Sequence, residues 1–229
     1  MIVIVGSPAW RSAVPPGPAG RACGIALAAA ARGARVELVG RVGEDAAGEA
    51  LLIALARAGV GHATVLRDPT RPTLVVDPPP AAPDDDGSSP VGEPVPSRRA
   101  AARTASSAGA RLEGADVDLA VRYLEPSGVL VVTEDAPAEA LAAAVSAAGY
   151  AQMQLVVLLP PVREAPGAVP AGLPEDATVL SVPSPDEGDA GAFEAIVAAY
   201  AATLDAGAPP AEAFAAAQGA TGWETSPAD

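Results

Sequence analysis

Short, continuous apolar runs recur along the chain, and longer Ala-rich stretches lie between them. Continuous runs of aliphatic and β-branched residues are typical of strands that are buried on both faces of a parallel sheet. The segments expected as strands are 2–6, 36–39, 64–66, 73–76, 128–132, 154–159 and 178–181. The Ala-rich stretches, several of them closed by Gly, predict helices. They cover 20–32, 49–58, 117–124, 137–148, 191–206 and 210–221.

Strands that alternate with helices predict an α/β fold of three layers, αβα, with an open and mostly parallel sheet. The length of 229 residues fits one domain, so residues 1–229 are expected to form a single unit. The segment 40–48 carries several Gly residues and is interpreted as a loop. Residues 77–97 are crowded with Pro, Asp, Gly and Ser, which predicts a loop or an insert.

The charge of the chain narrows the classes of partner. All 14 basic residues are Arg and stand against 28 acidic residues, which gives a net charge of −14. A nucleic-acid-binding protein needs a basic face to neutralise phosphates, so this class is excluded. The sequence has no apolar run of membrane-spanning length and begins with a strand pattern instead of a signal peptide. We therefore expect a cytoplasmic protein that does not enter a membrane.

A Gly-rich string lies at the centre of a family resemblance. The string is Gly40-Arg-Val-Gly-Glu-Asp-Ala-Ala-Gly48, and a helix ending in Ala58-Gly-Val60 follows it. Further blocks follow in order: Gly114–Val117, the strand 128–132 with Glu134, Leu159–Pro161 and Gly207–Gln218. In order and spacing these blocks resemble the ribokinase-like (PfkB) carbohydrate kinases. The resemblance implies a ribokinase-like sheet in a shortened chain.

The resemblance also implies a reaction, the transfer of the γ-phosphoryl group of ATP to a hydroxyl of a sugar or nucleoside, with Mg²⁺ on the phosphates. Such a transfer needs a carboxylate base and backbone amides that stabilise developing charge. The family pattern places Glu194 at the base position, and a second alignment places Asp189 there. It assigns Glu187 to the metal. It assigns the anion hole and the nucleotide contacts to Gly191, Ala192, Phe193 and Gln218.

The substrate side follows from the same resemblance, which assigns it to Arg11, Gly20, Gly24 and Gly40. Here the chain departs from the family pattern. Arg11 stands where the family has a sugar-binding Asp, Phe193 stands for a Gly, and Glu194 stands for the Asp base. Strand 178–181 runs almost directly into the helix that carries the base, so much of the nucleotide-binding half is missing. These departures predict a kinase homologue with impaired or absent activity; the alternative is a non-catalytic ligand-binding or assembly protein.

Several of these residues also have a purely structural interpretation. Glu194 is typical of the first turn of a helix, Asp45 of a loop or helix cap, and Cys23 of a small core residue. Segments 8–18 and 72–96 correspond to the family's β-lid, but they are too rich in Pro for ordinary central strands, with 73–76 supplying one edge strand. A sheet truncated on one side exposes an edge or a hydrophobic face, which predicts a homo-oligomer.

Overall fold

A computed structural model describes residues 1–76, 109–124, 127–161, 169–184 and 190–221. Within these residues six strands form one sheet in which every neighbouring pair is parallel. The strand order is β5 (Val65–Asp68), β4 (Val36–Gly43), β1 (Ile2–Val5), β7 (Val129–Val132), β8 (Gln154–Leu159) and β9 (Thr178–Ser181). The chain runs outward from β1 to β5 on one side and from β7 to β9 on the other. This doubly wound topology confirms the predicted α/β class.

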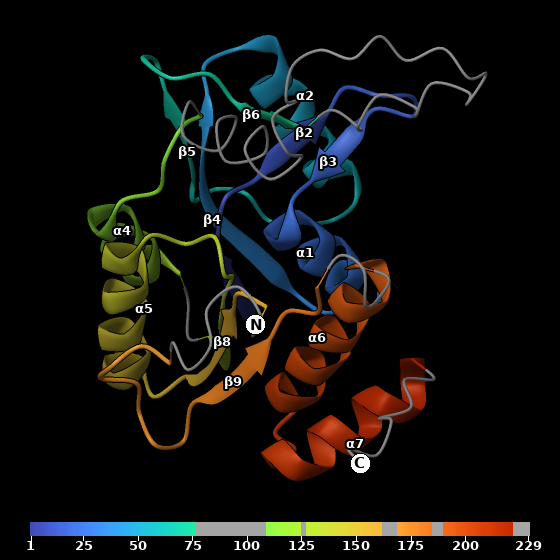
Figure 1. The fold of residues 1–229 in the computed structure, drawn as a ribbon, viewed down its shortest axis with the longest axis vertical. Coiled ribbons are helices and arrows are strands. Elements are labelled where there is room, and N and C mark those ends of the chain that lie inside the picture. The colour runs from blue at the N-terminus through green and yellow to red at the C-terminus, as the bar shows by residue number, and fades with distance from the viewer. Residues whose placement is uncertain (77–108, 125–126, 162–168, 185–189, 222–229) are drawn as a thin grey trace, which may run out of the picture.

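Helices cover both faces of the sheet (Figure 1). One face packs against α1 (Arg21–Ala31), α2 (Ala46–Arg57) and α6 (Ala190–Asp205). The other face packs against α4 (Gly114–Tyr123) and α5 (Ala138–Ala151). The last described helix, α7 (Pro210–Thr221), packs chiefly on α6. The three-layer αβα arrangement expected from the sequence is therefore confirmed.

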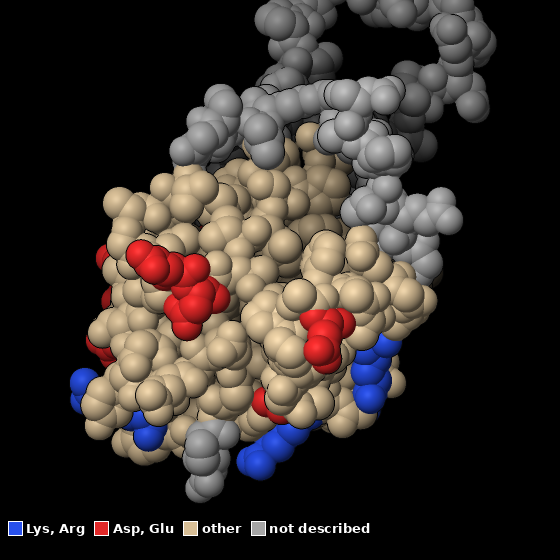
Figure 2. Space-filling model, turned by 90° about the horizontal axis from the view of Figure 1, so that it is seen from below, with Lys and Arg blue, Asp and Glu red and all other residues tan. Residues whose placement is uncertain are grey.

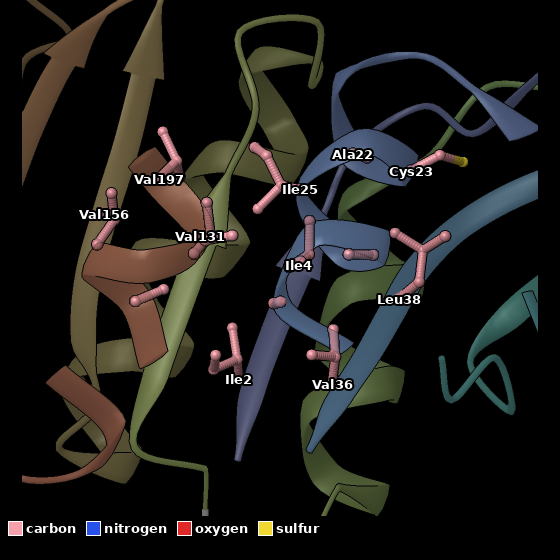
Figure 3. Packing of buried hydrophobic residues seen from close by; sticks show 14 of the residues in the cluster. Ile2, Ile4, Ala22, Cys23, Ile25, Val36, Leu38, Val131, Val156 and Val197 are labelled. Carbon is pink, nitrogen blue, oxygen red and sulfur yellow. The ribbon is translucent and has the colours of Figure 1, made fainter. Parts of the chain in front are cut away.

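Alternation along β1 divides the core into two layers. Ile2 and Ile4 point toward α1 and α6, whereas Val3 and Val5 point toward α4 and α5. Figure 3 shows the first of these layers, where Ile25 of α1 and Val197 of α6 meet the sheet. Because β1 is buried on both faces, it has no polar alternation, and this is why its sequence is a continuous apolar run.

The edge strand β9 is held by a polar contact with α6. The hydroxyl groups of Thr178 and Tyr200 lie 2.8 Å apart, within hydrogen-bonding distance, and Tyr200 is fully buried. On its other side the Tyr200 ring meets Phe214 of α7 edge to face, with centroids 6.1 Å apart. A single aromatic side chain thus joins the sheet edge, α6 and α7.

A second, three-stranded sheet lies above the carboxyl end of the larger one (Figure 1). Its order is β3 (Gly17–Ala19), β2 (Ala9–Arg11) and β6 (Leu74–Val76), and it corresponds to the lid position discussed above. The edge strand expected at 73–76 is confirmed. The expectation that 8–18 is unsuited to a central strand was wrong. The central strand β2 contains no Pro, and Pro18 lies in the edge strand β3, where a missing amide hydrogen is tolerated.

Two other sequence predictions concern loops. Segment 40–48 is not a loop throughout, because its first four residues continue β4 and α2 begins at Ala46. Gly40 and Gly43 have no side chain, which lets β4 run on close to Pro8 and to the backbone before β6. The predicted loop at 77–97 lies outside the described residues.

Figure 2 shows few charged side chains on the face seen from below, and both positive and negative side chains occur there.

Candidate functional site

The order in which strands are added to the sheet reverses between β1 and β7, and in doubly wound folds the ligand-binding crevice lies at the carboxyl ends of the strands at such a switch point. The loops that follow these two strands are tied to each other. The backbone amide of Ser7 donates to Asp135 at 3.2 Å. The Thr133 hydroxyl donates to the carbonyl of Val5 at 3.1 Å and also to Asp135. This hydrogen bonding fixes the position of Glu134, which lies between the two anchoring residues.

Arg21, the first residue of α1, is the centre of the polar cluster in this crevice. Its Nε donates to Oε1 of Glu134 at 3.1 Å, and its Nη1 lies 3.5 Å from Oε1 of Glu194. The same guanidinium lies over the ring of Phe193, 5.4 Å from its centroid, in a cation–π arrangement. Arg21 therefore joins α1, the loop after β7 and the first turns of α6.

The cluster is largely withdrawn from water. The side chains of Arg21, Glu134 and Glu194 are only 16%, 19% and 20% exposed. Nη1 of Arg21 and Oε2 of Glu134 are buried and make no hydrogen bond to any of the described residues. A buried donor and a buried acceptor that make no hydrogen bond are costly, and they are the kind of groups that a polar ligand satisfies.

Burial raises the pKa of Glu134 above the ordinary value of a glutamate, although the charge of Arg21 acts in the opposite direction. The folded state therefore binds a proton more tightly than the unfolded state does. As a result, the contribution of Glu134 to stability falls as pH rises from the unfolded pKa through the raised folded pKa.

We expect Glu134→Gln to remove this dependence on pH. Urea unfolding of the variant and the wild type from pH 4 to pH 7.5 measures the difference between their free energies of unfolding. Relative to the wild type, the variant should gain stability as pH rises, because the cost of the buried charge is removed. Glu49→Gln, at an exposed position in the first turn of α2, is the control and should show no such trend. A constant difference across the pH range would contradict the prediction.

Several residues predicted from the sequence lie at or beside this cluster. Gly191, Ala192 and Phe193 belong to the first turn of α6, with Phe193 buried and Gly191 exposed. Gly24 packs so closely on the carboxylate of Glu194 that a Cβ there would overlap it. Gly20 caps α1 with a φ of 85°, a left-handed conformation that favours glycine.

Other predicted residues are not brought into the cluster. Arg11 is exposed in the lid sheet, and its Nε donates to the carbonyl of Pro15 at 3.2 Å. Gly40 lies in β4, where a Cβ would meet the Pro8 ring at 2.6 Å. Gln218 is half-buried in α7. Asp189 and Glu187 lie outside the described residues.

The Gly-rich string forms the junction between α2 and the lid sheet. Asp45 caps α2 by accepting from the amide of Gly48 at 2.8 Å, which confirms the interpretation as a cap. It also accepts from the amide and the hydroxyl of Thr73, at 2.8 and 2.6 Å. These hydrogen bonds outweigh the effect of burial, which alone would raise the pKa of Asp45, so its pKa is lowered. Asp45 is thus an ionised anchor for the start of β6.

The structure adds residues to the site that sequence reasoning did not assign to it. Thr133 and Asp135 position the loop after β7, and Arg21 links two carboxylates that lie 113 and 173 residues further along the chain. The sequence feature that could have identified the loop after β7 as part of the site is the polar triplet Thr133–Asp135, directly after a buried strand. Arg21 was not identified as a site residue from the sequence, and its carboxylate partners come from α6 and from the loop after β7. Cys23 is a buried core residue, as predicted, and burial raises the pKa of its thiol to about 12.

Neither a metal-binding cluster nor a membrane-spanning helix is found among the described residues. No group of three or more His, Cys, Asp or Glu side chains among them is arranged to hold a metal ion. None of the helices in the described ranges combines the length and the apolar character needed to cross a membrane.

A doubly wound parallel sheet with a small three-stranded sheet above its carboxyl end is the fold that the sequence resemblance predicts. The comparisons with known proteins agree. A family model described as pfkB family carbohydrate kinase matches residues 12–76. Those residues include β3, β6, α1 and the Gly-rich string, so the resemblance to PfkB carbohydrate kinases is confirmed over this part of the chain. The sequence has no match among curated proteins.

Solved structures share this fold over nearly the whole chain. A putative ribokinase II from E. coli in complex with ATP and Mg²⁺ is 12% identical, with a TM-score of 0.64, and the match covers 96% of this chain and 91% of that one. Ribokinase from Arabidopsis thaliana, complexed with ribose and ATP, is 18% identical, with a TM-score of 0.60 and coverage of 96% and 90%. Aminoimidazole riboside kinase from Salmonella enterica is 14% identical, with a TM-score of 0.60 and coverage of 96% and 92%.

Proposed function

We propose that this chain is a PfkB-type carbohydrate or nucleoside kinase homologue that has lost efficient phosphoryl transfer and retains a polar ligand site. The observation that carries the proposal is the position of Arg21, whose guanidinium pairs with both Glu134 and Glu194 and covers Phe193. The crevice in which a sugar hydroxyl would meet a base is therefore occupied by an internal ion-pair cluster.

A catalytic base must reach the proton that it accepts and must be poised to take it. Glu194 is the described candidate, but its carboxylate packs on the backbone of Gly24 and is paired with Arg21. Both observations support impaired catalysis at Glu194. Asp189 remains the second candidate from the sequence.

ATP and Mg²⁺ are the cofactors implied by the family. In the described part of the chain no acidic cluster fits a metal, and the bulky Phe193 replaces a glycine where close approach of a phosphate is needed. These residues do not fit a magnesium–nucleotide site, so we derive no step through ATP or Mg²⁺. Glu187, the proposed metal ligand, would have to act from outside the described residues.

A second candidate function is an active kinase, and the start of α6 favours it. Backbone amides in the first turn of a 16-residue helix attract anions, and this turn begins beside the crevice. A ligand that displaced Arg21 from Glu194 would release the carboxylate. We further propose that residues 1–229 form a single cytoplasmic domain. We also propose that this domain assembles into a homo-oligomer through the β9 edge, and light scattering tests the oligomeric state.

Calorimetric titration of ATP with Mg²⁺, run beside a phosphoryl-transfer assay on a panel of sugars and nucleosides, tests the proposal. We expect no saturable binding at millimolar ATP and no transfer above that of Glu194→Gln. A thermal-shift screen of the same panel should still find a polar compound that stabilises the fold. Transfer that disappears in Glu194→Gln and persists in Glu49→Gln would overturn the proposal in favour of an active kinase.

A further inference from the structure

The two ends of the large sheet differ in how they are protected from pairing with another chain. β5, at one end, carries the charged residues Arg67 and Asp68, and charges along an edge strand discourage such pairing. β9, at the other end (Figure 1), has the sequence Thr-Val-Leu-Ser and pairs with β8 in a regular register. Because β9 has no charge, proline or bulge, its outer edge is open to a further strand.

The pairing of β9 with β8 identifies the backbone groups that the open edge offers. The amide of Val182 donates to the carbonyl of Leu159 at 2.9 Å, and in a parallel pair every second residue turns its amide and carbonyl toward the same neighbour. Leu180 therefore bonds to β8, whereas the amides and carbonyls of Val179 and Ser181 point to the open edge. Both residues are exposed, and none of the strands in the described ranges pairs with this side of β9.

We propose that this protein forms a two-fold dimer in which β9 pairs antiparallel with β9 of a second copy, so that the two large sheets become one continuous sheet. The outward groups of Val179 and Ser181 are placed symmetrically about Leu180. In an antiparallel pair centred on Leu180, Val179 exchanges two hydrogen bonds with Ser181 of the partner subunit, and the symmetry repeats this exchange. Such an interface uses the same surface on both subunits and closes at two. The inference rests on the oligomer proposed above and adds its symmetry and register.

The distribution of charge favours a second copy at this edge. With a net charge of −14, two copies of the chain repel each other wherever acidic surfaces meet. Residues 177–184 contain no charged side chain, and in the proposed register Asp176 lies opposite Ser184 of the partner subunit, so like charges do not face each other. Apolar side chains flank the strand on both faces of the sheet. Val179 lies on the α5 face and Phe214, which packs on Tyr200, on the α6 face, and each is 36% exposed.

Disulfide cross-linking tests the register. In the proposed dimer Leu180 faces its own copy in a pair without hydrogen bonds, where the Cα atoms are about 4.5 Å apart and within reach of a disulfide. Val179 lies diagonal to its own copy, at roughly 7–8 Å, which is beyond that reach. We expect Leu180→Cys to form a linked dimer on mild oxidation and Val179→Cys, the matched control, to remain largely unlinked. The native Cys23 is fully buried, so the wild type should give no linked dimer.

Size-exclusion chromatography with light scattering tests the dimer itself. The wild type should have twice the mass of one chain. Val179→Lys places a charge beside the edge and should weaken the dimer about tenfold or more. Leu119→Lys is its matched control, because Leu119 is an exposed apolar residue on α4, away from β9, and the variant should keep the mass of the wild type. Circular dichroism and the melting temperature of each variant separate lost pairing from lost folding.

The contrary outcomes are distinct from one another. A wild type that is monomeric at high micromolar concentration would overturn both this dimer and the proposed oligomer, but not the kinase homologue, which the titration of ATP decides. A dimer that Val179→Lys leaves intact would overturn the β9 edge as the interface. A dimer that Val179→Cys links as well as Leu180→Cys does would overturn the two-fold register.

Discussion

Gly43→Ala is expected to lower the free energy of unfolding by about 3 kcal/mol, the upper end for forcing extra volume into a packed site. A Cβ at this position would lie 2.5 Å from the amide nitrogen of Thr73 and 2.7 Å from the carbonyl oxygen of Arg71. Both neighbours are backbone atoms, so no rotation of a side chain relieves the overlap. The start of the lid strand β6 must therefore shift.

That shift would also break a hydrogen-bond network. The amide of Gly43 donates to the Thr73 hydroxyl at 2.9 Å, and Thr73 in turn donates twice to Asp45. Asp45 holds the start of α2, so the damage would spread from β4 to the lid sheet and the helix. Urea unfolding followed by circular dichroism measures the loss.

Gly149→Ala is the matched control for Gly43→Ala. Gly149 lies in the last turns of α5, and a Cβ there would meet nothing within 4 Å. Because alanine is the better helix former, this variant should gain roughly 0.5–1 kcal/mol in stability. Equal unfolding midpoints for Gly43→Ala and the wild type would show that the junction tolerates a methyl group, contrary to the prediction.

The Gly-rich string shows what the sequence reveals and what it leaves out. Its glycines predicted a loop and its aspartate predicted a helix cap, and Asp45 does cap α2. Gly40 and Gly43 were expected in a loop, and Gly40 was also expected to contact the substrate. In the structure they continue β4, and the space that they leave is filled by Pro8 and by the backbone near Thr73. Spacing along the chain identifies a close approach, but it does not identify what approaches.

The sheet was predictable because each of its strands is a local apolar run, as in Ile2–Val5 and Val129–Val132. The lid sheet was harder, since β2 and β3 have three residues each and lie among prolines. β2 pairs with β3 on one side and on the other with β6, which lies more than 60 residues further along the chain, and local propensity carries no information on such contacts.

The candidate site was predictable only in part, for a similar reason. The position of Glu194 near the start of a helix followed from the sequence. Its pairing with Arg21 depends on how α1 and α6 pack against each other on the sheet. The sequence indicates no partner for the Glu194 carboxylate, whereas the fold pairs it with Arg21, and this pairing changes the expected chemistry of the site.

Arg21→Met is expected to lower the free energy of unfolding by about 3 kcal/mol, the lower end for breaking a buried ion pair. Methionine keeps an apolar chain over Phe193 but leaves Glu134 and Glu194 without the positive charge that compensates them. Oε2 of Glu134 already has no hydrogen-bond partner in the described part of the chain, so the uncompensated charge would be poorly solvated. Unfolding in urea at pH 7.5 measures the loss.

A double-mutant cycle separates charge compensation from simple packing. If Arg21 acts as the counterion of Glu134, then Glu134→Gln should recover much of the loss in the double variant. Arg32→Met, at the exposed end of the same helix, should change stability by no more than about 0.5 kcal/mol. A double variant as unstable as Arg21→Met would show that the arginine acts through packing alone. A recovery would mean that the charge occupying the crevice is part of what holds the fold, so that activity could not be restored by removing Arg21 alone without a loss of stability.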